Sequence, residues 1–182
     1  MKEAFTRKSL LILGRGIGQV MFQNNALSGL LMLIGIFLNS WQMGLLAVSG
    51  NIISTLTARI SGYDCDDIKN GLYGFNGTLV GIAVGVFMLL TVSSLMLMAI
   101  ASCASTYIAR FFNMQRMLPG FTTPFILSVW MLLGLCSWLM PDMLLVSDTE
   151  TPASSSINYL QCFSMGIGPV SYTHLRAHET TL

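Results

Sequence analysis

The stretch from Phe75 to Met140 contains only two charged residues, Arg110 and Arg116, and this scarcity of charge constrains the fold most. Over the whole chain 9% of residues are charged and 53% are hydrophobic. A soluble domain carries roughly 25% charged residues, because its surface must be hydrated. The composition therefore predicts an all-α integral membrane protein and excludes an intrinsically disordered chain. A net charge of +1 offers no electrostatic basis for binding nucleic acid.

Apolar residues cluster into separate segments, and three of these approach the ~20 residues of a full membrane crossing. The segments are Ser9–Phe22, Ala26–Leu38, Trp41–Ile60, Phe75–Val86, Phe87–Ala109 and Thr122–Met140. Phe75–Val86 is glycine-rich and about half a crossing long, so we interpret it as a re-entrant half-helix, which is tolerated where it lines a cavity. The sequence thus predicts five transmembrane helices plus one re-entrant pore half-helix.

Basic residues give this arrangement an orientation, since Lys and Arg accumulate in cytoplasmic loops. Lys2, Arg7 and Lys8 place the N-terminus in the cytoplasm. Counting crossings from there puts the loop with Asp64, Asp66 and Asp67 outside, and the loop with Arg110 and Arg116 inside.

A short repeat suggests a second half. Leu10–Val20 reads LLILGRGIGQV and Leu160–Val170 reads LQCFSMGIGPV. An odd number of crossings separates the copies, so the second would run in the opposite direction, as in inverted-repeat channels and transporters. The predicted organisation is a cytoplasmic segment (1–8), a first transmembrane repeat (9–145), a linker (146–157), the start of a second repeat (158–168) and a non-native tail (169–182).

No metal, cofactor or catalytic group is expected. His174 and His178 form a lone pair in the tail, and a pair without a third ligand makes a poor metal site. The rest of the chain offers no Ser-His-Asp, Cys-His or paired-carboxylate set, so we do not expect an enzyme. Proton or ion coupling would need acidic or basic residues within the membrane. Their scarcity favours passive movement of a neutral solute.

Three stretches are more polar, aromatic or glycine-rich than a lipid-facing helix requires: Gly16–Ser28, Gly71–Gly85 and Leu118–Phe125. In the second, Gly77, Gly81 and Gly85 lie four residues apart, which favours a close packing face. In the third, Pro119 and Pro124 flank a pair of threonines. This pattern is compatible with an ordinary helix start or with a local opening that presents a Thr hydroxyl to a pore.

Three sequence runs, GIGQVMFQNNALSGLL, YDCDDIKNGLYGFNGTLVGIAVG and LPGFTTPF, resemble the first half of a bacterial urea transporter. The similarity extends over residues 10–168. It implies two homologous halves, a trimer with one pore per subunit, passive permeation of urea, and a multi-pass protein of the bacterial inner membrane. Because the pore of this family lies between the halves, we expect the chain alone to be inactive.

The resemblance also assigns roles to individual residues. Gln19 and Val20 match pore-lining positions, Phe22 and Phe75 match phenylalanines that form the filter slots, Leu79 matches an apolar pore wall, and Thr122 matches the threonine of the LPxxTxPF motif. Two alternatives stay open: a non-transporting membrane scaffold or assembly subunit, and a pore for another small neutral solute such as ammonia or a short amide.

Overall fold

The computed structural model of the chain describes residues 2–115 and 120–145, with side chains from Lys8 onward. The chain divides into a compact unit, Met1–Val146, and a second unit, Ser147–Leu182, which lies wholly outside the described residues. The predicted linker, the second repeat copy and the tail are therefore not described.

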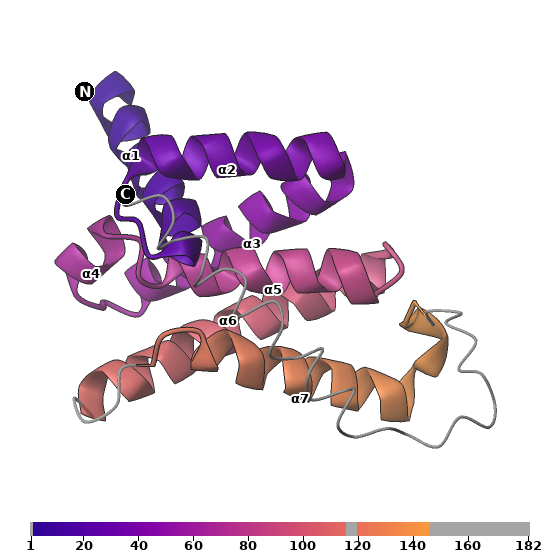
Figure 1. Cartoon of the computed structure of the whole chain (residues 1–182). Coiled ribbons are helices and arrows are strands. Elements are labelled where there is room, and N and C mark those ends of the chain that lie inside the picture. The colour runs from indigo at the N-terminus through magenta and orange to yellow at the C-terminus, as the bar shows by residue number, and fades with distance from the viewer. Residues whose placement is uncertain (1, 116–119, 146–182) are drawn as a thin grey trace, which may run out of the picture. The chain divides into compact units, whose positions relative to one another are not determined.

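All regular elements of the described part are helices (Figure 1). A single bridge between Met88 and Leu144 is the one strand-like pairing within that part. The prediction of an all-helical fold is confirmed for the described residues. The elements are α1 (Lys2–Gly18), η1 (Gln19–Met21), α2 (Ala26–Asn39), α3 (Trp41–Ile60), α4 (Cys65–Lys69), α5 (Gly74–Phe87), α6 (Val92–Gln115), α7 (Thr123–Leu139) and η2 (Pro141–Met143).

Side-chain caps explain where α2 and α3 begin. The Asn25 side-chain oxygen accepts a hydrogen bond from the Leu27 amide at 2.9 Å, and the Ser40 hydroxyl accepts from the Met43 amide at 3.4 Å. Such residues satisfy backbone donors that the first helical turn leaves unpaired. The polar breaks before Ala26 and Trp41 therefore separate helices, as the sequence predicts.

The start of α6 differs from the prediction of Phe87–Ala109. Residues after Phe87 leave the helical path because the Leu89 amide donates to the Met143 carbonyl at 2.9 Å, and the Leu145 amide donates to the Phe87 carbonyl at 2.9 Å. The helix restarts where Thr91 and Ser94 exchange side-chain-to-backbone hydrogen bonds of 2.9 and 3.2 Å.

Glycines bring α3 and α5 into close contact. A Cβ atom at Gly50 would overlap the Gly77 carbonyl, and one at Gly81 would overlap the Leu46 carbonyl. A Cβ atom at Gly85 would instead lie 3.1 Å from the end of the Leu46 side chain and overlap no backbone atom. Two of the three spaced glycines thus form the packing face that their spacing predicts.

Asn51 lies at the centre of this packing, with 1% of its surface exposed. Its side-chain nitrogen donates to the Leu13 carbonyl at 3.1 Å and to the Thr78 hydroxyl at 3.0 Å, while its oxygen accepts from the Thr55 hydroxyl at 3.2 Å. A buried amide needs such partners. One side chain therefore connects α1, α3 and α5.

By length and composition, two described helices can cross a membrane: α3 and α6. The bent pair α1–α2, with 75° between its arms, adds a third if it counts as one broken span. Helices α5 and α7 are apolar but shorter, at 14 and 17 residues.

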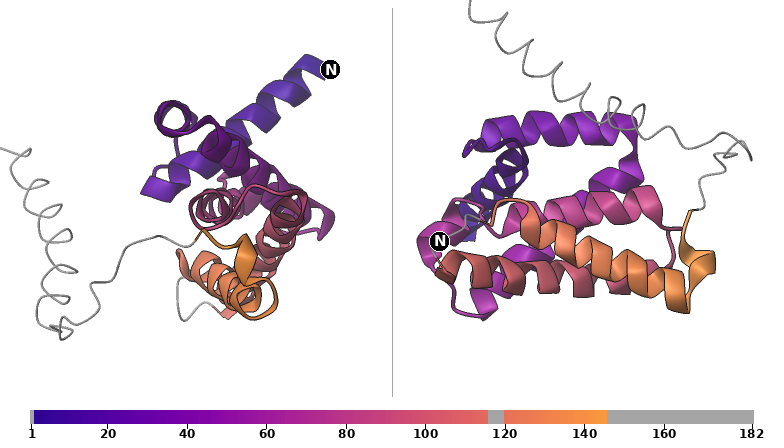
Figure 2. Two further views of the ribbon diagram at one scale, coloured as in Figure 1. Left: turned by 90° about the vertical axis from the view of Figure 1, so that its right-hand side faces the viewer. Right: turned by 60° about the horizontal axis from the view of Figure 1, so that its bottom comes forward.

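Several helices run lengthwise between two ends of the unit (Figure 2), and we call the end that carries α4 the α4 end. Arg110, near the end of α6, lies with its guanidinium carbon 5.2 Å from the centre of the Tyr63 ring, next to the α4 loop. Arg15 donates to the Lys69 carbonyl at 3.2 Å, and Arg59 lines a cavity with Ser9. The opposite end, where α5 meets the chain beyond α7, carries Asp142 as its one charge among the described residues.

This arrangement corrects one prediction. Counting crossings put the acidic loop and Arg110 on opposite sides of the membrane, whereas the contact between Arg110 and Tyr63 places them at the same end. The error arose because α3 and α6 run in the same direction: α5 lies between them and leads the chain to the opposite end.

Candidate functional site

A cavity of about 290 Å³ opens at the α4 end, and three of the six predicted site residues line it. We call it the amide–aromatic cavity. Its lining comes from η1 and the turn after it, the start of α5, the end of α6 and the start of α7. The lining residues are Gln19, Phe22, Leu72, Phe75, Asn76, Ala109, Asn113, Gly120, Phe121 and Pro124.

None of these ten residues is ionisable. The polar side chains are three amides, Gln19, Asn76 and Asn113, which offer both donors and acceptors without charge. Phenyl rings supply flat apolar walls beside them. The cavity can therefore hold a small polar molecule through hydrogen bonds but offers no charge to balance a bare ion.

Gln19 is positioned by a loop distant in sequence. It is the first residue of η1, and its side-chain nitrogen donates to the Asn70 carbonyl at 3.1 Å. Because a carbonyl can only accept, the amide orientation is fixed by this bond. The side-chain oxygen of Gln19 is then left as the acceptor.

Phe22 and Phe75 contribute rings from different elements. Phe22 follows η1 in a left-handed conformation, φ 56°, and its amide donates to the Gln19 carbonyl at 2.9 Å. Phe75 lies in the first turn of α5 and is 8% exposed. A left-handed non-glycine residue is strained, and such strain is common at functional sites.

Val20, Leu79 and Thr122 do not line the amide–aromatic cavity. Val20 and Leu79 are half-buried, on η1 and α5. Thr122 precedes α7, next to the lining residue Phe121, and its hydroxyl does not cap the helix. Its backbone carbonyl accepts from the Ile126 amide at 3.0 Å. Their roles at the site stay predictions.

Phe121 is a lining residue that the sequence analysis missed. Its ring lies edge-to-face with that of Phe22, with 5.7 Å between ring centres, and its φ of 34° is again positive. It stands inside the LPGFTTPF run, in which the resemblance assigns a role to Thr122 alone. A phenylalanine directly before the motif threonine was the available signal.

Asn76 was also missed as a lining residue. It is 1% exposed, and its side-chain oxygen accepts from the Phe125 amide at 3.2 Å. In the first turn of a helix the backbone amides have no helical partner. Asn76 therefore caps α7 from α5 and fixes the two helix starts that border the cavity. Pro124 is the second residue of α7 and has no backbone N–H. The absence of this N–H costs no helical hydrogen bond, because N–H groups in the first turn have no acceptor within the helix.

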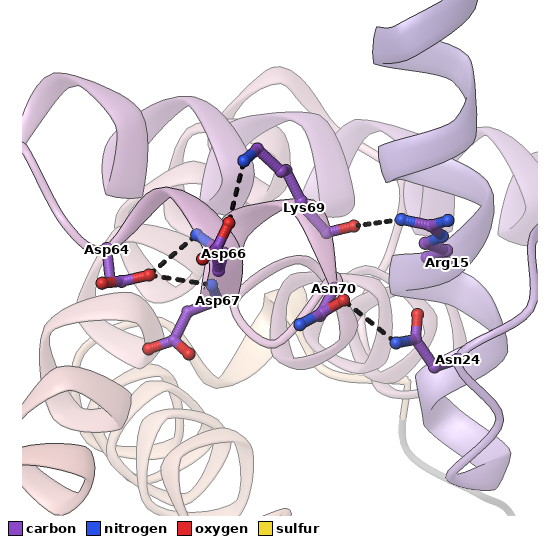
Figure 3. A network of polar contacts seen from close by, with 7 residues as sticks. All are labelled: Arg15, Asn24, Asp64, Asp66, Asp67, Lys69 and Asn70. Atoms are coloured by element: carbon purple, nitrogen blue, oxygen red, sulfur yellow. Dashed lines mark hydrogen bonds and ion pairs between the residues drawn. The ribbon is translucent and has the colours of Figure 1, made fainter.

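A polar network ties the α4 loop to the end of α1 (Figure 3). The Asp64 carboxylate caps α4 by accepting from the Asp66 and Asp67 amides at 2.7 and 3.3 Å. Lys69 forms an exposed ion pair with Asp66 at 2.8 Å. This network holds the loop whose Asn70 carbonyl binds Gln19.

The pKa values of two carboxyl groups in this loop are shifted in opposite directions. Burial raises the pKa of Asp67, and the nearby Asp64 adds to the effect while Arg110 opposes it. The hydrogen bond from Lys69 lowers the pKa of Asp66. In the described part of the chain no three His, Cys, Asp or Glu residues gather as metal ligands, and His174 and His178 lie outside it.

Comparisons with known proteins identify relatives of this chain. The urea transporter family model matches residues 10–171. Urea transporter 1 from Ovis aries is 30% identical over 174 residues, covering 86% of this chain and 44% of that protein. Urea transporter 1 from Mus musculus is 30% identical over 175 residues, and that from Rattus norvegicus is 31% identical over 172 residues, each with the same shares covered.

The chain thus spans less than half the length of the curated relatives it matches. The family model nevertheless covers most of the chain, including η1, α5 and the start of α7, which contribute to the amide–aromatic cavity. The chain belongs to the urea transporter family.

Proposed function

We propose that this chain forms one repeat of a channel-like transporter through which urea crosses a membrane passively. The observation that carries the proposal is the amide–aromatic cavity, in which uncharged amides lie beside phenyl rings. Urea is planar and neutral, with four N–H donors and one carbonyl acceptor. Removing a polar group from water without a new hydrogen bond costs roughly 2–7 kcal/mol. Oxygens along one edge of a flat slot would compensate urea for the water it loses.

The six predicted residues would divide this task. Gln19 and Thr122 would provide the polar edge, while Phe22, Phe75 and Leu79 would form the walls of the slot and Val20 would extend the lining. The support is strongest for Gln19, Phe22 and Phe75, which share the cavity. No general acid, general base or nucleophile is among its lining residues, which favours transport over catalysis.

A second repeat would complete the passage. The rings of Phe22 and Phe121 are 67% and 58% exposed at the cavity, so half of the expected slot lacks a facing wall in this repeat. We propose that an inverted second repeat supplies it, that this chain alone is inactive, and that the complete protein forms homotrimers in a lipid bilayer.

For the membrane path we propose five passes, assigned differently from the sequence prediction. The bent pair α1–α2 makes one pass and α3, α6 and α7 make three more. At 14 residues, α5 is about 21 Å long, so it does not cross the ~30 Å apolar core by itself. With the extended residues after it, α5 would complete the fifth pass.

Of the Lys and Arg residues whose side chains are described, Arg15, Arg59, Lys69 and Arg110 lie at the α4 end. The fifth, Lys8, directly precedes Ser9, which shares a cavity with Arg59. By the positive-inside rule, we propose that this end faces the cytoplasm together with the N-terminus. The bacterial inner membrane is the proposed location, as the sequence resemblance implies.

Two alternatives make different predictions. A membrane scaffold would use the glycine faces for packing and would leave urea permeability unchanged. A pore for ammonia or short amides would conduct them faster than urea.

The test is urea efflux from proteoliposomes containing the complete two-repeat protein, followed by light scattering. We expect efflux well above that of protein-free vesicles, and inhibition by close urea analogues. Efflux equal to that of protein-free vesicles would support the scaffold, and competition by ammonia or formamide without competition by urea analogues would support another solute.

A further inference from the structure

The segment after α4 is held against the end of α1 by side chains that lie outside the cavity lining. Asn24 donates from its side-chain nitrogen to the side-chain oxygen of Asn70 at 3.0 Å (Figure 3). Arg15 donates to the carbonyl of the preceding residue, Lys69, at 3.2 Å. A Cβ atom at Gly71, whose φ is +77°, would overlap the Gly16 amide, so the two segments touch through their backbones.

Asn70 connects this attachment to the cavity. Its side chain is bound by Asn24, and its carbonyl accepts the side-chain nitrogen of Gln19 at 3.1 Å. Asn24 and Asn70 are not among the residues that line the amide–aromatic cavity, whereas Gln19 is. The three residues form a chain of contacts that begins on the exposed surface and ends at the cavity wall.

The chemistry of the last contact decides what Gln19 offers to a solute. A glutamine amide has one accepting and one donating end. With the donating end committed to the Asn70 carbonyl, the accepting oxygen is the free end. A urea molecule presents mostly donors, so an acceptor suits it. If the Gln19 amide were free to rotate, its NH₂ group would face the cavity for part of the time. During that time the amide would offer urea no acceptor.

We propose that Asn24 is a positioning residue which, through Asn70, holds the Gln19 amide with its oxygen available to accept a urea N–H group. This inference rests on the proposed function. It assigns a role to Asn24 and Asn70, which do not themselves line the amide–aromatic cavity.

The experiment measures urea permeability of the complete protein in proteoliposomes. Asn24→Ala and Asn70→Ala should each lower it about fivefold, the factor that corresponds to one ordinary hydrogen bond. Asn70→Asp should stay near wild type, because the position needs only to accept from Asn24. Gln23→Ala is the matched control: Gln23 is an exposed neighbour whose side chain makes no hydrogen bond among the described residues.

A double-mutant cycle with Gln19→Ala separates positioning from a general structural role. If Asn24 acts through Gln19, Asn24→Ala should cause no further loss in the Gln19→Ala background. The same fivefold loss in both backgrounds, or wild-type permeability of Asn24→Ala alone, would overturn the inference while leaving urea transport intact. Wild-type vesicles no faster than protein-free ones would instead contradict the proposed function, and the inference with it.

Discussion

Gly77 shows how far the contact between α3 and α5 depends on one missing side chain. A Cβ atom there would overlap the Gly50 carbonyl and the Ser54 hydroxyl. Backbone atoms cannot move aside easily, so Gly77→Ala should lower the free energy of unfolding by about 2 kcal/mol or more. Thermal unfolding in detergent measures this effect.

Gly35→Ala is the matched control, because nothing lies within 4 Å of a Cβ atom at Gly35 in α2. Its effect should stay within about 1 kcal/mol. Equal stability of the two variants would show that α3 and α5 do not pack this closely.

Replacing Phe75 tests whether its ring forms a wall of the proposed slot. The ring is 8% exposed and borders the amide–aromatic cavity. In the complete protein, Phe75→Ala should widen the slot, so that bulkier amides such as methylurea gain permeability relative to urea by roughly tenfold, about 1.4 kcal/mol of lost discrimination. Efflux of both solutes from the same vesicles gives the ratio. An unchanged ratio would argue against Phe75 as a wall of the passage.

The raised pKa of Asp67 should make the free energy of unfolding depend on pH. Its pKa is raised mainly by burial, so the folded protein holds this proton more tightly than the unfolded chain does. The free energy of unfolding therefore falls as the pH rises from the ordinary carboxyl pKa through the raised one. Asp67→Asn should stabilise the protein at about pH 7 and have no effect near pH 3, where both forms are neutral.

Asp66→Asn provides the opposite case, because Lys69 lowers the pKa of Asp66. Its replacement should not stabilise the protein at neutral pH. Equal shifts for the two variants in unfolding experiments at both pH values would contradict the assignment.

At the scale of elements, the start of α7 depends on α5. The Phe125 amide has its acceptor in the side chain of Asn76, at 3.2 Å. Asn76→Ala leaves this partly buried donor unpaired, at a cost of about 1–3 kcal/mol. Hydrogen exchange at Phe125 should become faster, while exchange in the middle of α6 should not change.

Asn113→Ala is the control for this prediction, since Asn113 lines the same cavity from α6. It should leave exchange at Phe125 as in the wild type. Unchanged exchange in Asn76→Ala would mean that α7 starts independently of α5.

Local signals made most of the helices predictable from sequence. Polar breaks with capping residues such as Asn25 and Ser40 separate α1, α2 and α3, and Trp41–Ile60 is found with the predicted bounds. The start of α6 was mispredicted because it is set by pairing of Phe87 and Leu89 with residues beyond α7. No pattern within the apolar run reveals a partner more than fifty residues away.

The same distinction applies to the site. The resemblance led to Gln19, Phe22 and Phe75, which the fold brings together. Phe121 and Asn76 were missed because their places depend on a positive φ and on a long-range hydrogen bond. Composition could predict an uncharged site, but only the packing of α5 against α7 shows which side chains form it.

At the scale of the whole molecule, the direction of α3 and α6 decides which loops share a side of the membrane. Cys65 is exposed in α4, at the end that holds the described Lys and Arg residues. With the other cysteines replaced by serine, a membrane-impermeant maleimide should label Cys65 in inside-out vesicles and not in intact cells. Asp142→Cys, in a background that also lacks Cys65, should show the reverse pattern.

Labelling of Cys65 from the outside would show that the α4 end is extracellular and would overturn the proposed orientation. Labelling of both positions from one side would contradict the placement of the α4 loop and the end of α7 at opposite ends.

The central claim is that an uncharged passage exchanges the hydration of a planar amide for protein oxygens. Radiolabelled urea uptake and chloride leak, recorded on the same proteoliposomes of the complete protein, test it most directly. We predict rapid urea uptake that stops at equal concentrations inside and outside, is unaffected by sodium or proton gradients, and occurs without added chloride leak. Urea accumulation driven by an ion gradient, a chloride leak that rises with protein content, or uptake as slow as through lipid alone would contradict it.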